Sequence, residues 1–114
     1  MTNRTSIPVP PQAPADLIAV AGGDIQVILA WTECGADGIG FHIERAEGIG
    51  FACLFSEVGT TRAHIAAFRD ESVKPRTTYS YRVHAWNAAG DSSLSNVAVV
   101  TTHEVETELL ADKE

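Results

Sequence analysis

The fold is decided by residues 68–96, which read FRDESVKPRTTYSYRVHAWNAAGDSSLSN. Within this stretch residues 78–87 alternate between an apolar face and a mixed, largely polar one, which predicts a β-strand with one buried side. Pro75 before the strand and Gly90 after it predict turns, because proline presets φ and glycine tolerates a positive φ. The apolar face carries Tyr79, Tyr81, Val83 and Ala85.

Short runs of similar character occupy most of the remaining chain, and none between residues 15 and 102 shows a sustained helical period. We expect strands at residues 25–31, 41–45, 51–58 and 95–102, with a further one marked by Leu17 and Ala19. Together with residues 78–87 and the segment near Phe68 this makes seven short strands. That number, with frequent turns, predicts an all-β, seven-stranded antiparallel sandwich of the immunoglobulin-like type.

Length and charge exclude several classes of protein. The chain has 114 residues, 45% of them hydrophobic, a formal charge of −7 and a pI near 4.9. This length favours one domain with one core. The acidic balance argues against binding to nucleic acid or to an anionic membrane, since both need a positive field. No apolar run approaches the roughly 20 residues that span a bilayer, and we see no signal peptide in the first residues.

Two tails flank the expected domain, which we place at residues 14–102. Residues 1–13 hold three of the five prolines and predict an extended arm. Residues 103–114 hold five of the 15 acidic residues. This acidic tail is either a solvated terminus or a short helix whose Val105 and Leu109 dock on another surface.

The sequence resembles a fibronectin type III domain of the bacterial type. The similarity covers about residues 14–102 and is most specific between Phe68 and Asn96. The matching residues are Pro14-Ala15-x-Leu17, Trp31, Ile39-Gly40-Phe41-x-Ile43, Phe68-x-Asp70, Val73-x-Pro75-x-Thr77-Thr78-Tyr79-x-Tyr81-Arg82-Val83-x-Ala85-x-Asn87-x-Ala89-Gly90-x-Ser92 and Ser95-Asn96.

This resemblance implies a core between two sheets. Tyr79 would form a tyrosine corner, with a buried ring and a hydroxyl bonded to the backbone a few residues upstream. We expect the structural core to include Trp31, Tyr79, Leu29, Ile43 and Val83.

Candidate catalytic and metal sites are weak. The segment Gly90-Asp91-Ser92-Ser93-Leu94 superficially resembles a hydrolase signature, but it falls in a loop without a strand–elbow–helix, so we expect no catalysis. We expect no metal and no cofactor: His42 and His84 should share one outward face, but two histidines make a weak site. Cys34 and Cys53 should lie too far apart for a disulfide, which predicts free thiols.

One surface stands out as a candidate contact face. If Asn87 lies opposite Ser95, Arg82 faces Val100, and a partly apolar strip forms on the outward side of the sheet. The strip would consist of Trp86, His84, His42, Arg82 and Val100. Tryptophan is enriched both at interface hot spots and in sugar-stacking sites. The alternative is that Trp86 packs locally over Arg82 and neighbouring side chains.

The functional hypothesis is a non-catalytic spacer, adhesion or protein-binding module of a larger extracellular or cell-surface protein or assembly. It rests partly on the family resemblance, because a fold does not fix a function. The partner would be another protein or a neighbouring domain. The competing hypothesis is a carbohydrate-binding module, which requires Trp86 to be exposed to a glycan.

Overall fold

A computed structural model describes residues 8–23, 25–49 and 54–104. These residues form eight strands, and none of them belongs to a helix long and apolar enough to cross a bilayer. In chain order the strands are β1 (Ala15–Ala21), β2 (Val27–Thr32), β3 (Gly40–Glu47), β4 (Ser56–Arg62), β5 (Ala67–Asp70), β6 (Thr78–Asn87), β7 (Gly90–Asp91) and β8 (Ala98–Thr101).

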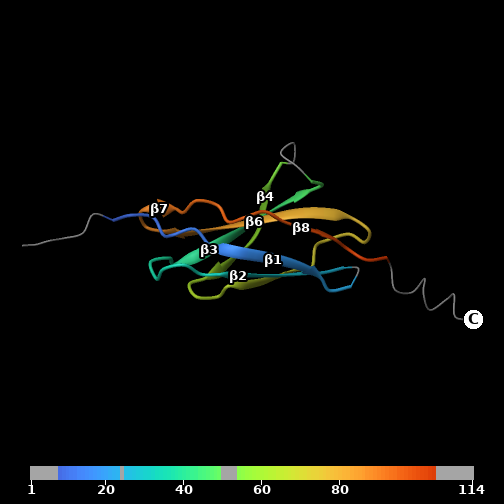
Figure 1. Cartoon of the computed structure of the whole chain (residues 1–114), viewed down its shortest axis with the longest axis horizontal. Coiled ribbons are helices and arrows are strands. Elements are labelled where there is room, and N and C mark those ends of the chain that lie inside the picture. Colours follow the sequence, from blue (N-terminus) through green and yellow to red (C-terminus); the bar gives the residue numbers. More distant parts are fainter. Residues whose placement is uncertain (1–7, 24, 50–53, 105–114) are drawn as a thin grey trace, which may run out of the picture.

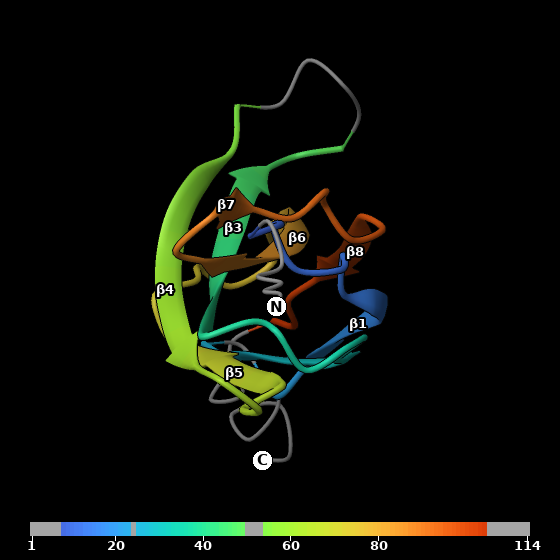
Figure 2. The same ribbon diagram turned by 90° about the vertical axis from the view of Figure 1, so that its left-hand side faces the viewer.

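The strands pack as two antiparallel sheets, and the expected sandwich is confirmed (Figure 1). The smaller sheet has the order β1-β2-β5. The larger has the order β4-β3-β6-β7, and β8 also pairs with β6. Figure 2 shows the two layers end-on, with β4 along one margin of the larger sheet and β5 in the layer opposite. Strands β7 and β8 together take the place of the seventh strand that the sequence predicts.

The core lies between the sheets, where the alternation along β6 directs its apolar side chains. The rings of Trp31 and Phe41 meet edge to face, with centroids 5.3 Å apart. The five side chains that we expected in the core are all buried: Trp31, Tyr79, Leu29, Ile43 and Val83. They join Leu17, Val27, Phe41, Val73, Tyr81 and Ala85 in one cluster.

The tyrosine corner has the predicted geometry. The backbone N–H of Lys74 donates to the hydroxyl of Tyr79 at 2.8 Å, five residues upstream of the ring. The ring itself is 2% exposed. The bond satisfies a backbone donor that would otherwise be unpaired at the entrance to β6.

The prediction of a strand at residues 51–58 is wrong in its position. Residues 51–53 lie outside the described part of the chain, and β4 runs from Ser56 to Arg62, with Gly59 in its middle. The expected strand stopped before Gly59, but the ring of Phe68 lies directly over this residue. A Cβ at position 59 would come 2.3 Å from the ring, so glycine is what allows β4 to approach the core here.

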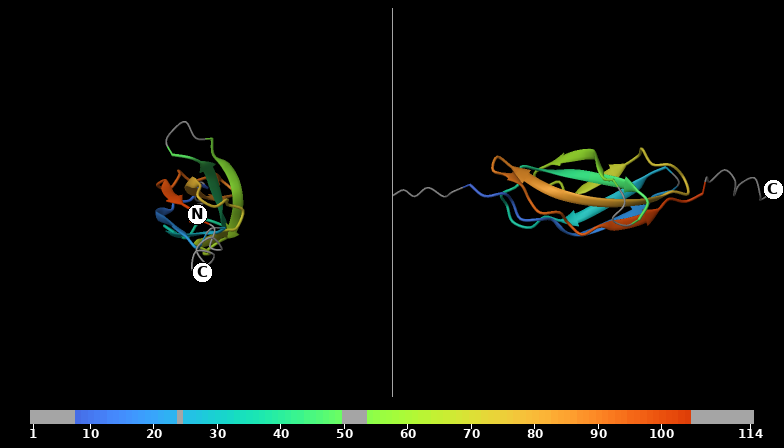
Figure 3. Two further views of the ribbon diagram at one scale, coloured as in Figure 1. Left: turned by 90° about the vertical axis from the view of Figure 1, so that its right-hand side faces the viewer. Right: turned by 90° about the horizontal axis from the view of Figure 1, so that it is seen from above.

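The chain enters and leaves the sandwich at opposite ends of its long axis (Figures 1 and 3). At one end the side-chain N–H of Asn87 donates to the carbonyl of Val9, and Pro11 is buried. At the other end the N–H of Arg76 donates to the carbonyl of His103, and its guanidinium pairs with Glu104. The domain limits at residues 14 and 102 remain predictions. Residues 1–7 and 105–114, with the possible helix, lie outside the described residues.

Candidate contact surfaces

Four of the five residues of the expected strip do share the outer face of the larger sheet. His42 on β3 lies directly opposite His84 on β6, and their ring centroids are 5.0 Å apart. The ring of Trp86 follows at 5.7 Å from that of His42. Arg82 lies on the same face, two residues before His84, and pairs with Glu44 while its guanidinium covers the ring of Phe55.

Val100 is not part of this face, and the register that placed it there is wrong. Asn87 lies opposite Gly90 rather than Ser95, because a two-residue turn closes the hairpin and Gly90 adopts a φ of 134°. Val100 consequently pairs with Tyr79, whose side chain is buried, and packs against the core. Its neighbour Val99 takes the outward position.

Trp86 is half-buried, and its indole lies against Gly40 rather than over Arg82. A Cβ at position 40 would come 2.6 Å from the indole nitrogen. This nitrogen is buried without a hydrogen-bond partner among the described residues. The indole is therefore packed on the sheet itself and is not a freely projecting platform.

A carboxylate lies near each of the two histidines of this face. Nδ1 of His42 is 2.7 Å from Glu57, and Nε2 of His84 is 3.7 Å from Asp91. Among the described residues no three histidine, cysteine, aspartate or glutamate side chains gather so as to hold a metal ion.

Ser92 of the hydrolase-like segment, and Ser95 just after it, are occupied in the backbone pairing of β6. The hydroxyl of Ser92 accepts from the N–H of Ala85 and donates to the carbonyl of Ser93. The hydroxyl of Ser95 accepts from the N–H of Val83 in the same way. Both hydroxyls take the place of a strand's carbonyl, which is a structural role. Cys34 is a free, half-buried thiol, and Cys53 lies outside the described residues.

A buried polar cluster around Asp70 has no counterpart among the expected sites. The carboxylate is 3% exposed and accepts hydrogen bonds from the hydroxyl of Tyr81 at 2.7 Å and from Arg45 at 2.9 Å. Its other oxygen accepts from the N–H and the hydroxyl of Ser72. Asp70 belongs to the residues that carry the family resemblance, but nothing in the sequence shows that Arg45, from the other sheet, completes the cluster.

Opposing effects set the pKa values in this cluster. Burial alone would raise the pKa of Asp70, but the bonds from Ser72, Tyr81 and Arg45 outweigh it and hold that pKa below its usual range. Burial and the hydrogen bond to Asp70 both raise the pKa of Tyr81. Burial would lower the pKa of Arg45, yet Asp70 raises it on balance. Through an ion pair and hydrogen bonds the cluster connects β5 of the smaller sheet with β3 and β6 of the larger one.

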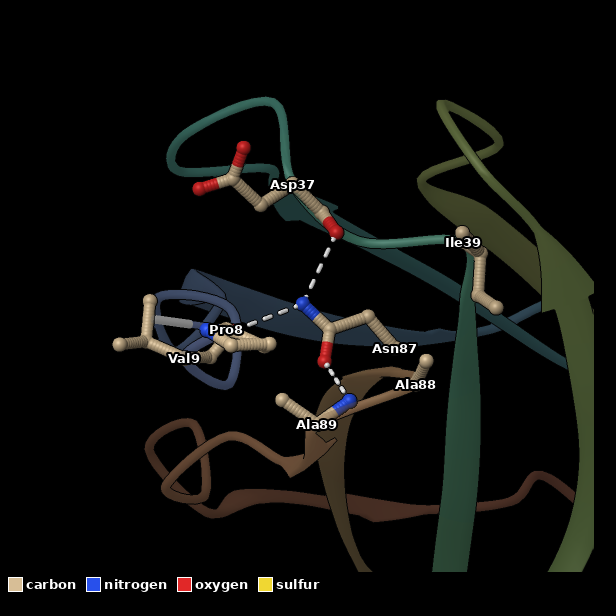
Figure 4. A pocket seen from close by; sticks show the side chains of 7 residues that line it. All are labelled: Pro8, Val9, Asp37, Ile39, Asn87, Ala88 and Ala89. Atoms are coloured by element: carbon tan, nitrogen blue, oxygen red, sulfur yellow. Dashed lines mark hydrogen bonds between the residues drawn. The ribbon is translucent and has the colours of Figure 1, made fainter. Parts of the chain in front are cut away.

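A shallow hollow of about 470 Å³ lies at the end of the sandwich where the chain enters (Figure 4). Asn87 forms its centre: its side-chain N–H groups donate to the carbonyls of Val9 and Asp37, and its oxygen accepts from the N–H of Ala89. Val9 and Ile39 are more than half exposed beside it. The hydrogen bonds of Asn87 thus fix the backbone of three segments around a hollow with an exposed apolar rim.

A second exposed apolar surface covers the outer side of the smaller sheet. Val20 lies opposite Ile28, and Ile18 lies opposite Ala30 in the same register. Ile18 and Val20 are more than half exposed. The sequence held a signal for this surface, because apolar residues follow one another along β1 and β2 instead of alternating with polar ones.

Known proteins resemble this chain over most of its length. No family model matches it. Contactin-6 of Mus musculus is 28% identical over 116 aligned positions, which cover 93% of this chain and 11% of that protein. Contactin-5 of Mus musculus is 27% identical, with 90% of this chain and 10% of that protein covered. The chain thus spans about a tenth of the length of these relatives.

Solved structures give the same assignment at the level of the fold. Domains from titin superpose with a TM-score of 0.71 at 23% identity, covering 82% of this chain and 32% of that one. An Fn3-like protein from Clostridium thermocellum gives 0.69 at 21% identity, covering 84% and 97%. The FN1–FN3 domains of chicken CNTN1 give 0.68 at 20% identity, covering 83% and 33%. A bacterial origin is not established by these likenesses, but the chain has the fold of a fibronectin type III-like domain, similar to those of contactin and titin.

Proposed function

We propose that this chain is a non-catalytic spacer and protein-binding module of a larger extracellular or cell-surface protein or assembly. The observation that carries the proposal is that the described chain enters the sandwich near residue 8 and leaves it near residue 104, at opposite poles (Figure 3). A module with this geometry sets a fixed distance between whatever precedes and whatever follows it.

Hydrogen bonds anchor the chain at both poles, which supports a role as a rigid spacer. Asn87 fixes Val9 at the entrance. At the exit the hydroxyl of Thr102 accepts from the N–H of Thr77, and its side chain is 3% exposed. The chain therefore leaves the sandwich in a defined direction at each end.

The similarity to domains of multidomain proteins supports a neighbouring domain as the partner. The match covers 11% of the length of contactin-6 and 32% of the titin segment, so in both cases most of the matched chain lies outside the aligned domain. The hollow around Asn87, with exposed Val9 and Ile39 at its rim, would be the surface that a neighbour at the entrance pole contacts. The extracellular or surface location rests on the resemblance of the fold.

The packing of Trp86 favours protein contact over glycan binding. Sugar stacking uses an open aromatic face, whereas this indole lies against Gly40 and beside His42. We expect glycans to leave the tryptophan fluorescence unchanged. Saturable quenching that disappears in a Trp86→Phe variant would contradict this choice.

A distance measurement between the poles tests the spacer role. Spin labels at positions 9 and 104, introduced as cysteines with Cys34 and Cys53 changed to serine, report the separation of the two chain ends by pulsed electron resonance. We expect one narrow distribution centred at the length of the sandwich. A broad distribution, or a short distance, would overturn the proposal. The narrow distribution should broaden in a matched sample with Asn87→Ala, which releases Val9.

A further inference from the structure

The open margin of the larger sheet is strand β4, which among the described residues pairs with β3 alone (Figure 2). The N–H groups of Ser92 and Ser95 donate to the carbonyls of Ala85 and Val83, so the odd-numbered residues of β6 direct their backbone groups away from β3. Because directions alternate along an antiparallel ladder, Phe41 and Ile43 then bond to β4. The N–H and C=O of Thr60 are consequently directed toward the open margin, where a further strand could pair.

A β-bulge puts three polar side chains of β4 on its outer face. Gly59 lies opposite Ile43, but Glu57 lies opposite Glu44, so Val58 is an extra residue in the strand. The bulge turns Glu57 outward, where it bonds to His42 at 2.7 Å. The outer face of β4 therefore carries Glu57, Thr60 and Arg62, with Thr60 at the centre and the two charges at equal strand positions on either side.

This arrangement is complementary to itself. We propose that two copies of this chain associate through β4, antiparallel, about a two-fold axis at Thr60. Thr60 then pairs with Thr60 of the second copy through two backbone hydrogen bonds. Arg62 of each copy faces Glu57 of the other, which gives two equivalent ion pairs across the axis.

The charges of β4 argue for a second copy as the occupant. Arg62 is exposed, and its guanidinium enters no ion pair with the described residues. Only one oxygen of Glu57 is engaged by His42, and the side chain is half exposed. Bulges and charges on a margin normally prevent pairing with foreign strands. Here the same charges exclude strands of the wrong pattern and match those of an identical strand.

The interface is small and each copy carries a charge of −7, so the association is weak and depends on the local ion pairs.

An exchange of charges in the whole chain tests the proposed dimer. Glu57→Arg places arginine opposite arginine in a homodimer, and Arg62→Glu places glutamate opposite glutamate. In an equimolar mixture of these two variants both pairs become complementary again.

We expect the wild-type chain to dimerise reversibly in sedimentation equilibrium. Each variant alone should dimerise about tenfold more weakly or worse, and the mixture should regain wild-type association. Arg69→Glu, an equal charge change on the other sheet, is the control and should leave the dimer intact. A wild-type chain that stays monomeric at all concentrations would overturn the proposal. So would a dimer that Arg62→Glu leaves unchanged, since it would form elsewhere, as on the apolar face of β1 and β2.

Amide exchange of the wild-type chain provides a test without substitutions. The N–H of Thr60 should exchange more slowly with solvent as the protein concentration rises, because it becomes hydrogen-bonded in the dimer. The N–H of Thr61, already bonded to β3, serves as the reference and should not change. A rate for Thr60 that is independent of concentration contradicts the pairing even where the chain associates.

Discussion

The indole of Trp86 lies across Gly40, the residue directly opposite it on the neighbouring strand. The contact is so close that a Cβ at position 40 would meet both the indole nitrogen at 2.6 Å and the carbonyl of Thr61 at 2.8 Å. Glycine at this position is thus required by the indole on one side and by the edge strand on the other.

Gly40→Ala should therefore displace Trp86 and lower the free energy of unfolding by about 1–3 kcal/mol, as expected for overpacking. In a ¹H–¹⁵N spectrum the indole signal of Trp86 should move while that of Trp31 stays in place. Gly38→Ala is the matched control, because a Cβ there makes only ordinary contacts at 3.6 Å or more. Equal effects of the two substitutions would show that the indole does not occupy this site.

The contact between Gly59 and Phe68 predicts strong coupling between two positions that lie on different sheets. Gly59→Ala should destabilise the fold by about 1–3 kcal/mol, because the new Cβ overlaps the ring. Phe68→Ala removes the ring and should make the alanine at 59 nearly harmless. Urea denaturation of both single variants and the double variant measures the coupling energy, expected at about 1 kcal/mol or more. Strict additivity would mean that the ring does not cover Gly59.

Asp70 should make the stability of the protein dependent on pH in the acid range. Its pKa in the folded state is lowered, so the carboxylate stabilises the fold above its unfolded pKa of about 3.9. This contribution is lost as the pH falls through the folded pKa. Asp70→Asn should cost about 3 kcal/mol near neutral pH, because Arg45 loses its buried partner.

The free energies of unfolding of wild type and Asp70→Asn should begin to converge below about pH 4 and should meet only once the pH is below the lowered folded pKa of Asp70, where both proteins carry an uncharged group. Urea titrations at a series of pH values give the difference between the two proteins. Asp37→Asn, in the exposed loop before β3, controls for the loss of an acidic group. A difference that stays constant down to acid pH would show that the charge of Asp70 does not contribute.

Tyr79→Phe isolates the hydroxyl of the tyrosine corner. The ring and its packing remain, but the N–H of Lys74 loses its acceptor. We expect a loss of about 1–3 kcal/mol in the free energy of unfolding, the cost of a buried unpaired donor. The amide of Lys74 should at the same time exchange faster with solvent. Unchanged stability with unchanged exchange would mean that water or another group replaces the hydroxyl.

The sequence predicted what depends on local alternation and missed what depends on contacts between distant strands. The pattern around Tyr79 to Ala85 placed β6 at its observed bounds, Thr78–Asn87, and gave the correct buried face. The position of β4 could not be predicted, because the glycine in its middle is explained only by Phe68 from the other sheet.

The expected contact face shows the same difference between features set by local alternation and features set by the pairing of distant strands. His42 and His84 were placed together by the alternation of two neighbouring strands, and the structure sets them opposite one another. Val100 was misplaced because the register depends on the length of the turn at Ala88 and Ala89, and an error of an odd number of residues turns a strand over. The role of Asp70 in connecting the two sheets could not be predicted, because it depends on Arg45, which lies 25 residues away in the chain.

Proton–proton contacts in the core, recorded by NMR, test whether the two sheets close around Trp31 and Tyr79. Two sheets that close around Trp31 and Tyr79 require nuclear Overhauser contacts between the rings of Trp31 and Phe41, whose centroids are 5.3 Å apart. The rings of Tyr79 and Tyr81, both on β6 and 6.3 Å apart, should show contacts as well, which reports the shared inward face of that strand. We predict both sets, together with slow exchange of the Lys74 amide. Rings that show only contacts to water, with rapid exchange at Lys74, would contradict the sandwich and every function inferred from it.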